Sequence, residues 1–337
     1  MDFNMKKVIS VLLLVALTLC LTCCAGENSG AKSKVFPESV TFRETDALKG
    51  KKIGCSIVYK GDEWCSTVAN ALEMFAEHYG ASLTCEDGDM NDETQTKQIE
   101  NMIANGVDLI LIDPVTADGC NEALMKAVEK KIPIILYDST WVNSDQYAVT
   151  SVSWDQYQTG VVVGNYLLDY IRKKGGGKAT IVELENAIST HCQDRFVGFH
   201  DTVDKATDVE IKVLGKYDTQ GNREIAYNII SSIVEPYDFV LSDIDNGSNG
   251  AVAALQAAGN TKVKVLSMGG YGAEPFEAVH SDDVNYLAFL DVDAWQFAEL
   301  VINSTIDFFE GKEQEKLINF QPTMVDHTNA EKYWIFD

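Results

Sequence analysis

From Lys51 onward, short β-branched runs alternate regularly with amphipathic stretches, and this alternation is the feature that most constrains the fold. Runs rich in Val, Ile and Leu favour strands at 52–58, 81–85, 107–112 and 132–137. Between them, apolar residues recur at helical spacing at 63–79, 92–105 and 116–130. Parallel strands joined by right-handed crossover helices produce this order, so the sequence predicts a doubly wound parallel α/β sheet.

A second set of the same kind follows. Helices are expected at 157–172, 189–203, 222–234 and 247–258, and strands at 178–184, 209–214, 237–242, 262–267 and 285–290. The length of 337 residues suits two domains of about 150 residues each. Two such lobes form a cleft, and ligands in these sheets bind beyond the carboxyl ends of the strands.

The first 23 residues have the pattern of a bacterial export signal. Lys6 and Lys7 precede an apolar stretch at 8–21, which is short for a membrane span. The Leu21-Thr22-Cys23-Cys24 segment has lipobox spacing, which predicts that Cys24 becomes a lipidated N-terminus; an ordinary cleaved signal or an uncleaved anchor is the alternative. Residues 24–45 would then tether the folded part to the extracytoplasmic face of the cell membrane.

The chain is strongly acidic, with 27 Lys and Arg against 51 Asp and Glu, a net charge of −24. Removing the signal, which carries Asp2, Lys6 and Lys7, leaves 25 − 50 = −25. This excess argues against a nucleic-acid partner and against basic residues that hold the protein on anionic lipid.

Motifs for catalysis or metal binding are lacking in the sequence. There is no Gly-x-Ser-x-Gly elbow and no His-Glu-x-x-His, and none of the cysteines after Cys24 forms a Cys-x-x-Cys, so we expect no enzyme, no metal and no cofactor. An exported hydrolase stays open only because the carboxylate pairs Asp243/Asp245 and Asp291/Asp293 occur at strand ends. The five cysteines after Cys24 are Cys55, Cys65, Cys85, Cys120 and Cys192, and at least one must lack a partner within the chain. Most are expected to be small apolar residues in or near the core, and a Cys55–Cys85 bridge between neighbouring strands stays open.

Polar residues follow directly after the expected strands and are the candidates for ligand contacts. Asp62 and Trp64 follow the first strand, Asp113 the third and Asp138 the fourth. An indole face can cover the C–H side of a sugar ring, and Asp accepts hydroxyl protons. Asp is also common there as a helix cap, so each of these residues has a purely structural alternative.

From about Lys51 to Lys316 the chain resembles the periplasmic sugar-binding proteins of ABC transporters, of the ribose- and galactose-binding type, whose core also occurs in the effector domains of LacI-type repressors. The segments that carry the resemblance are IVYKGDEWCSTVANALEMFAEHYG (57–80), NGVDLILIDP (105–114), IPIILYD (132–138), DRFVGF (194–199) and GSNGAVAALQAAG (247–259). The resemblance implies a type I periplasmic binding fold, in which two lobes are joined by three crossovers near Trp154, Val292 and Phe320. The N-terminal lobe would combine 46–154 with 293–318, and the C-terminal lobe 155–292 with 319–337.

The resemblance also implies the site residues. It assigns ligand contacts to Asp62, Trp64, Asp113, Asp138, Gln193 or Arg195, and Asp291. In the second lobe the chain departs from the family pattern. Asp245 follows Ile244 where the family commonly has Asn-Asp, Gly269 or Gly270 replaces an Asp, and Thr219 stands where an aromatic side chain often sandwiches the sugar. Asp245 and Thr219 are nevertheless counted among the expected ligand contacts.

The implied function is capture of a small polyhydroxylated ligand and its delivery to an ABC permease, with the protein a monomer. A sensory module for a membrane receptor or histidine kinase would have the same fold and stays open. The surplus of carboxylates would also suit a ligand that carries an amine. A DNA-binding repressor is excluded by the export signal, the lack of a helix-turn-helix and the charge.

Overall fold

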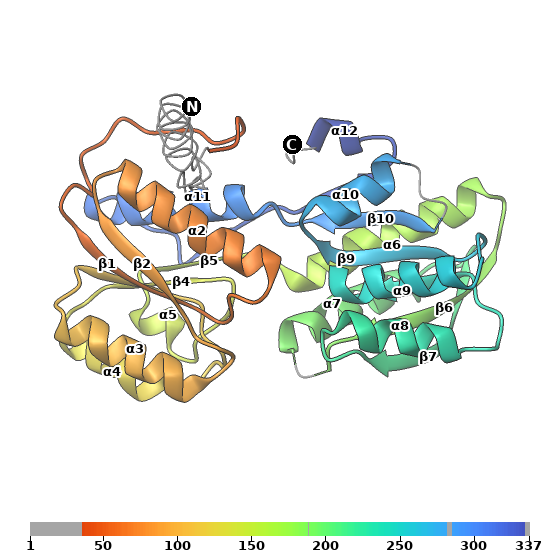
Figure 1. Ribbon diagram of the computed structural model, residues 1–337, viewed down its shortest axis with the longest axis horizontal. Coiled ribbons are helices and arrows are strands. Elements are labelled where there is room, and N and C mark those ends of the chain that lie inside the picture. Colours follow the sequence, from red (N-terminus) through yellow and green to blue (C-terminus); the bar gives the residue numbers. More distant parts are fainter. Residues whose placement is uncertain (1–35, 188, 282–284, 334–337) are drawn as a thin grey trace, which may run out of the picture. The chain divides into compact units, whose positions relative to one another are not determined.

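The structure is a computed structural model that describes residues 36–187, 189–281 and 285–333 (Figure 1). The predicted signal, Cys24 and most of the predicted tether lie outside these residues. Strands among the described residues form two six-stranded sheets. Within the described part of the chain, no helix combines the length and the apolar character that a membrane span requires.

The first sheet has the strand order β11-β5-β4-β3-β1-β2, and all its neighbours are parallel. Its strands are β1 (Lys52–Ile57), β2 (Ser82–Asp87), β3 (Leu109–Ile112), β4 (Ile134–Tyr137), β5 (Thr150–Ser153) and β11 (Leu317–Asn319). Its helices are α2 (Glu63–His78), α3 (Asp92–Ala104), α4 (Asn121–Glu129), α5 (Ser144–Tyr147) and α11 (Ala294–Phe309). Figure 1 shows α2 and α11 on one face of this sheet and α3 and α4 on the other.

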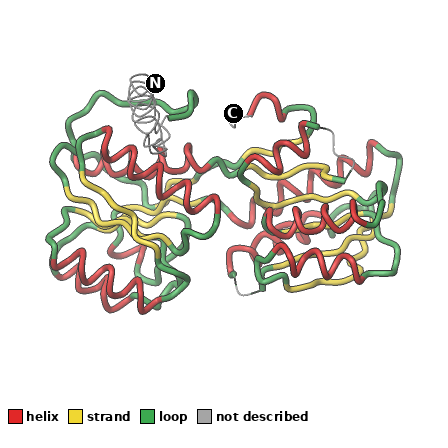
Figure 2. The backbone as a smooth tube through the Cα atoms, in the orientation of Figure 1, coloured by secondary structure: helices red, strands yellow, loops and turns green. Residues whose placement is uncertain are grey.

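The second sheet has the order β12-β10-β9-β8-β6-β7, parallel except for β12, which runs antiparallel to β10. Its strands are β6 (Lys178–Glu185), β7 (Glu210–Asp218), β8 (Phe239–Ser242), β9 (Lys264–Gly270), β10 (Tyr286–Asp291) and β12 (Thr323–Asp326). Its helices are α6 (Gln156–Lys173), α7 (Thr190–Val203), α8 (Arg223–Ser232), α9 (Asp245–Ala257), α10 (Ala273–His280) and α12 (Ala330–Tyr333) (Figure 2).

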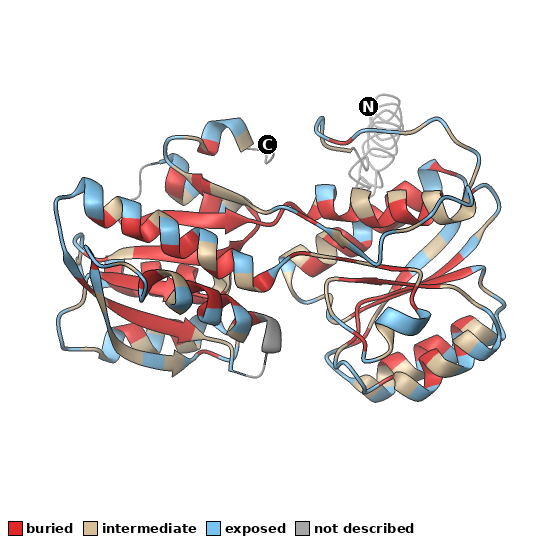
Figure 3. Ribbon diagram, turned by 180° about the vertical axis from the view of Figure 1, so that it is seen from behind, coloured by how far each residue is buried: buried red, intermediate tan, exposed pale blue. Residues whose placement is uncertain are grey.

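Both faces of the second sheet are covered, because successive side chains of each strand point to opposite sides. Ile181 of β6 packs with Leu167 and Phe199 from α6 and α7, whereas the next residue, Val182, packs with Ile230 and Leu255 from α8 and α9. The central strands β8, β9 and β10 are therefore largely apolar and almost entirely buried, whereas the edge strand β7 is only partly buried (Figure 3).

The chain passes between the sheets three times. Trp154 lies between β5 of the first sheet and α6, which packs on the second. Val292 lies between β10 and α11, and Phe320 lies between β11 and β12. These are the positions at which the sequence predicted crossovers, and β11 ends at Asn319, one residue beyond the lobe boundary expected at 318.

The doubly wound α/β prediction is confirmed, but several details were wrong. The helix expected at 116–130 begins only at Asn121, because the Thr116 hydroxyl bonds the Asp92 carboxylate and accepts the Gly119 N–H, which keeps 116–120 in turns. Seven elements of the described chain were missed altogether: β5, α5, α10, α11, β11, β12 and α12.

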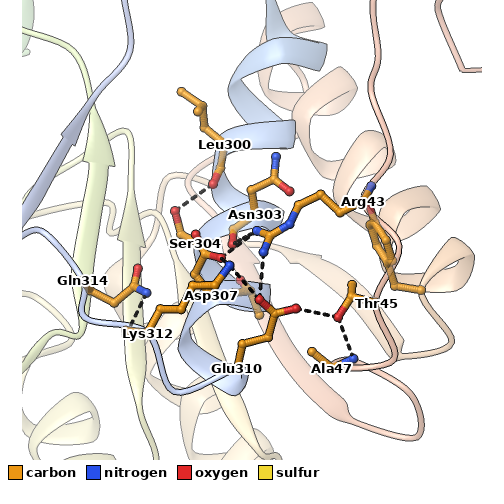
Figure 4. Close-up of polar contacts among 12 residues, drawn as sticks. Arg43, Thr45, Ala47, Leu300, Asn303, Ser304, Asp307, Glu310, Lys312 and Gln314 are labelled. Atoms are coloured by element: carbon orange, nitrogen blue, oxygen red, sulfur yellow. Dashed lines mark hydrogen bonds and ion pairs between the residues drawn. The ribbon is translucent and has the colours of Figure 1, made fainter.

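The segment expected to be a tether is already part of the fold from Thr41 onward, because the Thr41 hydroxyl donates to Glu299. Figure 4 shows the contacts that Arg43 and Thr45 add. Arg43 forms ion pairs with Asp307 at 2.7 Å and Glu310 at 2.9 Å, both at the end of α11, and Thr45 donates to Glu310 at 2.7 Å. These contacts fasten residues 41–45 to a helix that follows them by more than 250 positions.

Candidate functional site

Aromatic side chains meet where the chain crosses between the sheets. Trp64, in the first turn of α2, lies 5.7 Å from Trp154 and 5.1 Å from Phe297 between ring centroids. Phe320, on the third crossover, lies 6.4 Å from Trp154. The Trp64 indole N–H donates to the Val292 carbonyl at 2.8 Å. Trp64 is half-buried and is held against the first two crossover segments, at Trp154 and Val292.

Asp62 caps the helix that presents Trp64. Its carboxylate accepts the Cys65 N–H at 3.1 Å, so α2 begins at Glu63 as predicted. The pKa of the buried Cys65 thiol is raised, most strongly by burial and then by the charges of Asp62, Asp113 and Asp138. The three carboxylates therefore lie near this cysteine. The structure thus brings together three of the predicted site residues at the carboxyl edge of the first sheet.

Asp113 is fully buried at the end of β3. One carboxylate oxygen accepts the Val58 N–H at 3.3 Å, and the other, Oδ1, has no hydrogen-bond partner in the structure. Burial, followed by the neighbouring Asp138, raises the pKa of Asp113 well above its ordinary value. Asp138 itself has a φ of 59°, a left-handed conformation that Asp tolerates in turns.

Arg195 lies in the second lobe and is almost fully buried. It donates to the Gln156 side chain and to the Asp243 carbonyl, each at 2.7 Å, and its guanidinium lies 5.8 Å from the Trp154 ring. The carbonyl of Met268 accepts a longer bond at 3.5 Å. These contacts fix Arg195 between the crossover after β5 and the carboxyl ends of β8 and β9.

Asp243, which the sequence analysis did not select as a site residue, lies beside Arg195 with no exposed surface. Its carboxylate accepts the Asn186 N–H, while its Oδ1 has no hydrogen-bond partner in the structure. Burial raises the pKa of Asp243 to about 6, against the lowering effect of that hydrogen bond and of Arg195. Only its position directly after a strand could have indicated it.

Asp245 starts α9 and faces the acidic end of α2. Its carboxylate accepts the Asn246 N–H at 2.8 Å and the Tyr271 N–H at 3.4 Å. Burial is the largest cause that raises the pKa of Asp245 to about 7, and the negative charge of Asp62 is the next. Asp62 belongs to the first lobe and Asp245 to the second. Carboxylates from both lobes therefore lie within electrostatic reach of each other.

Asp291 ends β10 and is 7% exposed. Its Oδ1 has no hydrogen-bond partner, and burial followed by Asp293 raises its pKa well above the ordinary value. Asp293, in contrast, caps α11 by accepting the N–H groups of Trp295 and Gln296. The two members of this pair therefore differ: Asp291 is a buried carboxylate with an unpaired oxygen, and Asp293 is a helix cap.

Thr219 and Gln193 lie apart from this group, near the end of β6. The buried Thr219 hydroxyl donates to the Glu185 carbonyl at 3.1 Å, and Gln193 Nε2 donates to the Asn186 carbonyl at 3.4 Å. Both side chains hold the loop whose Asn186 N–H reaches Asp243.

Several buried polar atoms at the carboxyl edges of the sheets have no partner. The donors are Trp154 Nε1 and Gln156 Nε2, and the acceptors are Oδ1 of Asp113, Asn186, Asp243 and Asp291. Sequence reasoning missed Gln156 and Asn186, and it placed Trp154 only as a crossover. Among the described residues, no group of three or more His, Cys, Asp or Glu side chains is arranged to hold a metal ion.

Known proteins share this architecture. A sequence profile of the periplasmic binding protein domain matches residues 53–313. The galactofuranose-binding protein YtfQ of Escherichia coli K12 is 26% identical over 83% of this chain and 87% of its own length. The ribose import binding protein RbsB of Bacillus subtilis 168 is 23% identical over 94% of this chain and 97% of its own length.

Solved structures agree. The periplasmic component of the arabinose ABC transporter from Shewanella sp. ANA-3 superposes with a TM-score of 0.76 at 23% identity, covering 84% of this chain and 94% of that one. The fructose-binding periplasmic domain of a hybrid two-component system superposes with a TM-score of 0.73 at 25% identity, covering 84% and 93%. The resemblance read from the sequence is confirmed: with its two α/β lobes and a profile match over most of its length, the chain belongs to the periplasmic binding protein domain family.

Proposed function

We propose that this protein is an extracytoplasmic solute-binding protein that captures a small polyhydroxylated ligand, a sugar or a sugar-like molecule, and delivers it to an ABC importer. The names of its relatives support this role, since they bind galactofuranose, ribose and xylitol. The role requires no covalent chemistry and no cofactor.

The observation that carries the proposal is the set of buried donors and acceptors without partners. A buried polar group that lacks a hydrogen bond costs about 1–3 kcal/mol, so such groups in a folded protein usually await a ligand or water. A hydroxyl both donates and accepts. A polyol can therefore serve the unpaired Trp154 N–H and the unpaired oxygens of Asp243 and Asp291 with one type of group.

We assign ligand contact to Asp113, Asp138, Arg195, Asp245 and Asp291, together with the exposed part of Trp64. Asp62 acts chiefly by capping the helix that presents Trp64. Thr219 and Gln193 shape the loop at the end of β6. The lobes 46–154 with 293–318 and 155–292 with 319–337 close on the ligand by a hinge motion at the three crossovers.

The protein acts as a monomer held at the membrane by a lipid on Cys24, in our proposal. The lipobox spacing in the sequence supports this anchor. Mass spectrometry of the N-terminal peptide from membranes tests it, because a diacylglyceryl-modified Cys24 differs in mass from a free terminus. A water-soluble mature protein with an unmodified terminus would contradict it.

A second candidate role is ligand sensing for a membrane receptor or histidine kinase. One observation favours it, the likeness to the fructose-binding periplasmic domain of a hybrid two-component system. Deleting the gene separates the roles: a delivery protein is needed for uptake of radiolabelled ligand, whereas a sensor is needed for the ligand's transcriptional response.

Thermal unfolding of the purified protein with pentoses, hexoses, furanoses, polyols and amino sugars tests the binding function. A ligand at about 100 times its dissociation constant adds about 2.7 kcal/mol to the free energy of unfolding. The Asp291→Asn variant should lose much of this response, and Asp118→Asn, at an exposed turn position, is the matched control. A panel in which no compound raises the melting temperature would contradict the proposal.

A further inference from the structure

Five carboxylates gather where α2 approaches the carboxyl ends of β8, β9 and β10. This acidic cluster consists of Asp62, Glu63, Asp245, Asp291 and Asp293. The last four lie around Tyr271, and Asp62 lies near Asp245 and Glu63. The Tyr271 N–H donates to Asp245 at 3.4 Å, and the Tyr271 hydroxyl bonds the Thr67 side chain on α2. Burial is the largest cause that raises the pKa of this hydroxyl, and the charges of Asp293, Asp291 and Glu63 raise it further. All three carboxylates therefore lie within electrostatic reach of the hydroxyl.

Glu63 is placed further by the glycine after Tyr271. A Cβ on Gly272 would lie 2.7 Å from a Glu63 carboxylate oxygen, so this carboxylate packs directly on the loop between β9 and α10. Asp62 and Glu63 also raise the pKa of Asp245. Residues from α2 and from the second sheet thus contribute to one negatively charged region.

No described cation pairs directly with the acidic cluster. Burial and then nearby carboxylates, Glu274 among them, raise the pKa of Glu63, and Glu274 is itself paired with Arg223 at 2.7 Å. None of the ion pairs among the described residues involves any member of the acidic cluster. Arg195 is directed instead to Gln156 and to main-chain carbonyls.

An independent observation indicates that the cluster awaits a ligand. Asp291 is 7% exposed, and its Oδ1 has no hydrogen-bond partner although its carboxylate faces Asp293 and Tyr271. Carboxylates that only capped helices would be satisfied by N–H groups, as Asp62 and Asp293 are. A buried acceptor beside like charges requires a donor, and a positively charged donor relieves the repulsion as well.

We propose that the acidic cluster binds a protonated amino group of the ligand, so that the preferred ligand is an aminated polyol such as an amino sugar rather than a neutral sugar. An ammonium group offers three donors, and its hydrogen bonds to carboxylates are charge-assisted and about twice as strong as neutral ones. The inference rests on the proposed binding function and refines its substrate class.

Matched pairs of sugars test the inference by isothermal titration calorimetry and thermal unfolding. D-glucosamine is compared with D-glucose and D-galactosamine with D-galactose, and the N-acetylated sugars serve as bulky neutral controls. We expect at least one aminated sugar to bind about tenfold or more tightly than its neutral counterpart. Raising NaCl from about 50 mM to about 500 mM should reduce this preference, because salt screens the charge interaction.

Two variants make the test specific to the cluster. Glu63→Gln changes an exposed side chain without a structural hydrogen bond, and Asp291→Asn keeps the shape of the buried group. Each should lower the preference for the aminated sugar, whereas Asp118→Asn should not. Circular dichroism and the melting temperature of each variant check that it folds.

The outcomes separate the inference from the proposed function. Neutral sugars that bind as tightly as their aminated counterparts would overturn the inference and leave the binding function standing. The inference would also fall if both variants weakened the two members of a pair equally. Failure of every sugar to bind would count against the binding function itself.

A second inference rests on different residues. Cys55 of β1 and Cys85 of β2 are register partners in neighbouring parallel strands, and their sulfur atoms lie 2.9 Å apart. Both side chains are buried, and the Tyr137 hydroxyl lies 3.5 Å from the Cys55 sulfur. The structure has both thiols reduced, and burial raises the pKa of Cys55 well above its ordinary value.

We infer that Cys55 and Cys85 form a disulfide when the exported chain folds. Each thiol loses its proton, one S–S bond forms, and two electrons pass to a disulfide-containing oxidant of the compartment, which is reduced to its dithiol. Because attack requires an accessible thiolate, the bond should form before the sheet closes over the sulfur atoms.

Refolding the mature chain with oxidised and reduced glutathione tests this inference. After alkylation under denaturing conditions, peptide mapping should show one link, between the Cys55 and Cys85 peptides, with Cys65, Cys120 and Cys192 alkylated. In Cys85→Ser, Cys55 should become alkylated or bound to glutathione. Alkylation of both Cys55 and Cys85 in the wild-type chain, or a link between other cysteines, would overturn the inference.

Discussion

Replacing Asp243 by Asn should change how the stability of the protein depends on pH. The Asp243 side chain has no exposed surface, and burial raises its pKa from 3.8 to about 6. A pKa that differs by 1 between the folded and the unfolded chain corresponds to about 1.36 kcal/mol. The difference of about 2 for Asp243 therefore amounts to about 3 kcal/mol. This is a large part of the 5–15 kcal/mol by which proteins are usually stable.

The sign follows from proton binding. Below pH 3.8 the carboxyl is protonated in both the folded and the unfolded chain, and its burial costs least. Between about pH 4 and pH 6 the unfolded chain releases the proton while the folded chain keeps it, so the free energy of unfolding falls. Above pH 6 both states are ionised and the loss of about 3 kcal/mol is complete.

Urea unfolding of the ligand-free wild type and of Asp243→Asn at several pH values between 4 and 7 measures this effect. The neutral amide does not titrate, so the stability of the variant relative to wild type should rise by about 3 kcal/mol across this range. The Asp243 carbonyl bonded to Arg195 remains in the variant. Parallel stability curves for the two proteins would refute the reasoning, and Asp118→Asn, at an exposed position, should parallel wild type.

Three further predictions concern packing and the crossovers. Trp64→Phe removes the 2.8 Å hydrogen bond to the Val292 carbonyl but keeps an aromatic ring. It should lower the free energy of unfolding by about 1 kcal/mol in urea titrations and weaken ligand binding. Gly160→Ala should destabilise by more than about 2 kcal/mol, since its Cβ would lie 1.8 Å from the Arg195 carbonyl oxygen. Arg195→Met leaves the Gln156 side chain and the Asp243 carbonyl without their donor, so it should lower the melting temperature even without ligand. An unchanged melting temperature would contradict the last two.

The order of strands and helices could be predicted from the sequence because it depends on local periodicity. The apolar run of β3 is buried on both faces, as a parallel strand requires. Helix α2 begins after its cap Asp62 and ends before Gly80, whose φ is +75°, and both signals were legible in the sequence. Some of the missed elements lack such signals, since β5 and β12 are only four residues long. Helix α11 was missed although its cap Asp293 and its apolar stripe are both present in the sequence.

The sequence alone determined that polar residues collect at the strand ends and that both lobes carry acidic groups there, because parallel strands all end at one edge. Only the tertiary structure decided which of these groups are engaged. Trp64 bonds a carbonyl that lies 228 positions away, Asp62 and Asp293 cap helices, and Asp291 keeps an unpaired oxygen. Gln156, Asn186 and Asp243 became candidates for the same reason. Burial and the lack of a partner depend on contacts between residues far apart in the chain, and no local pattern encodes those contacts.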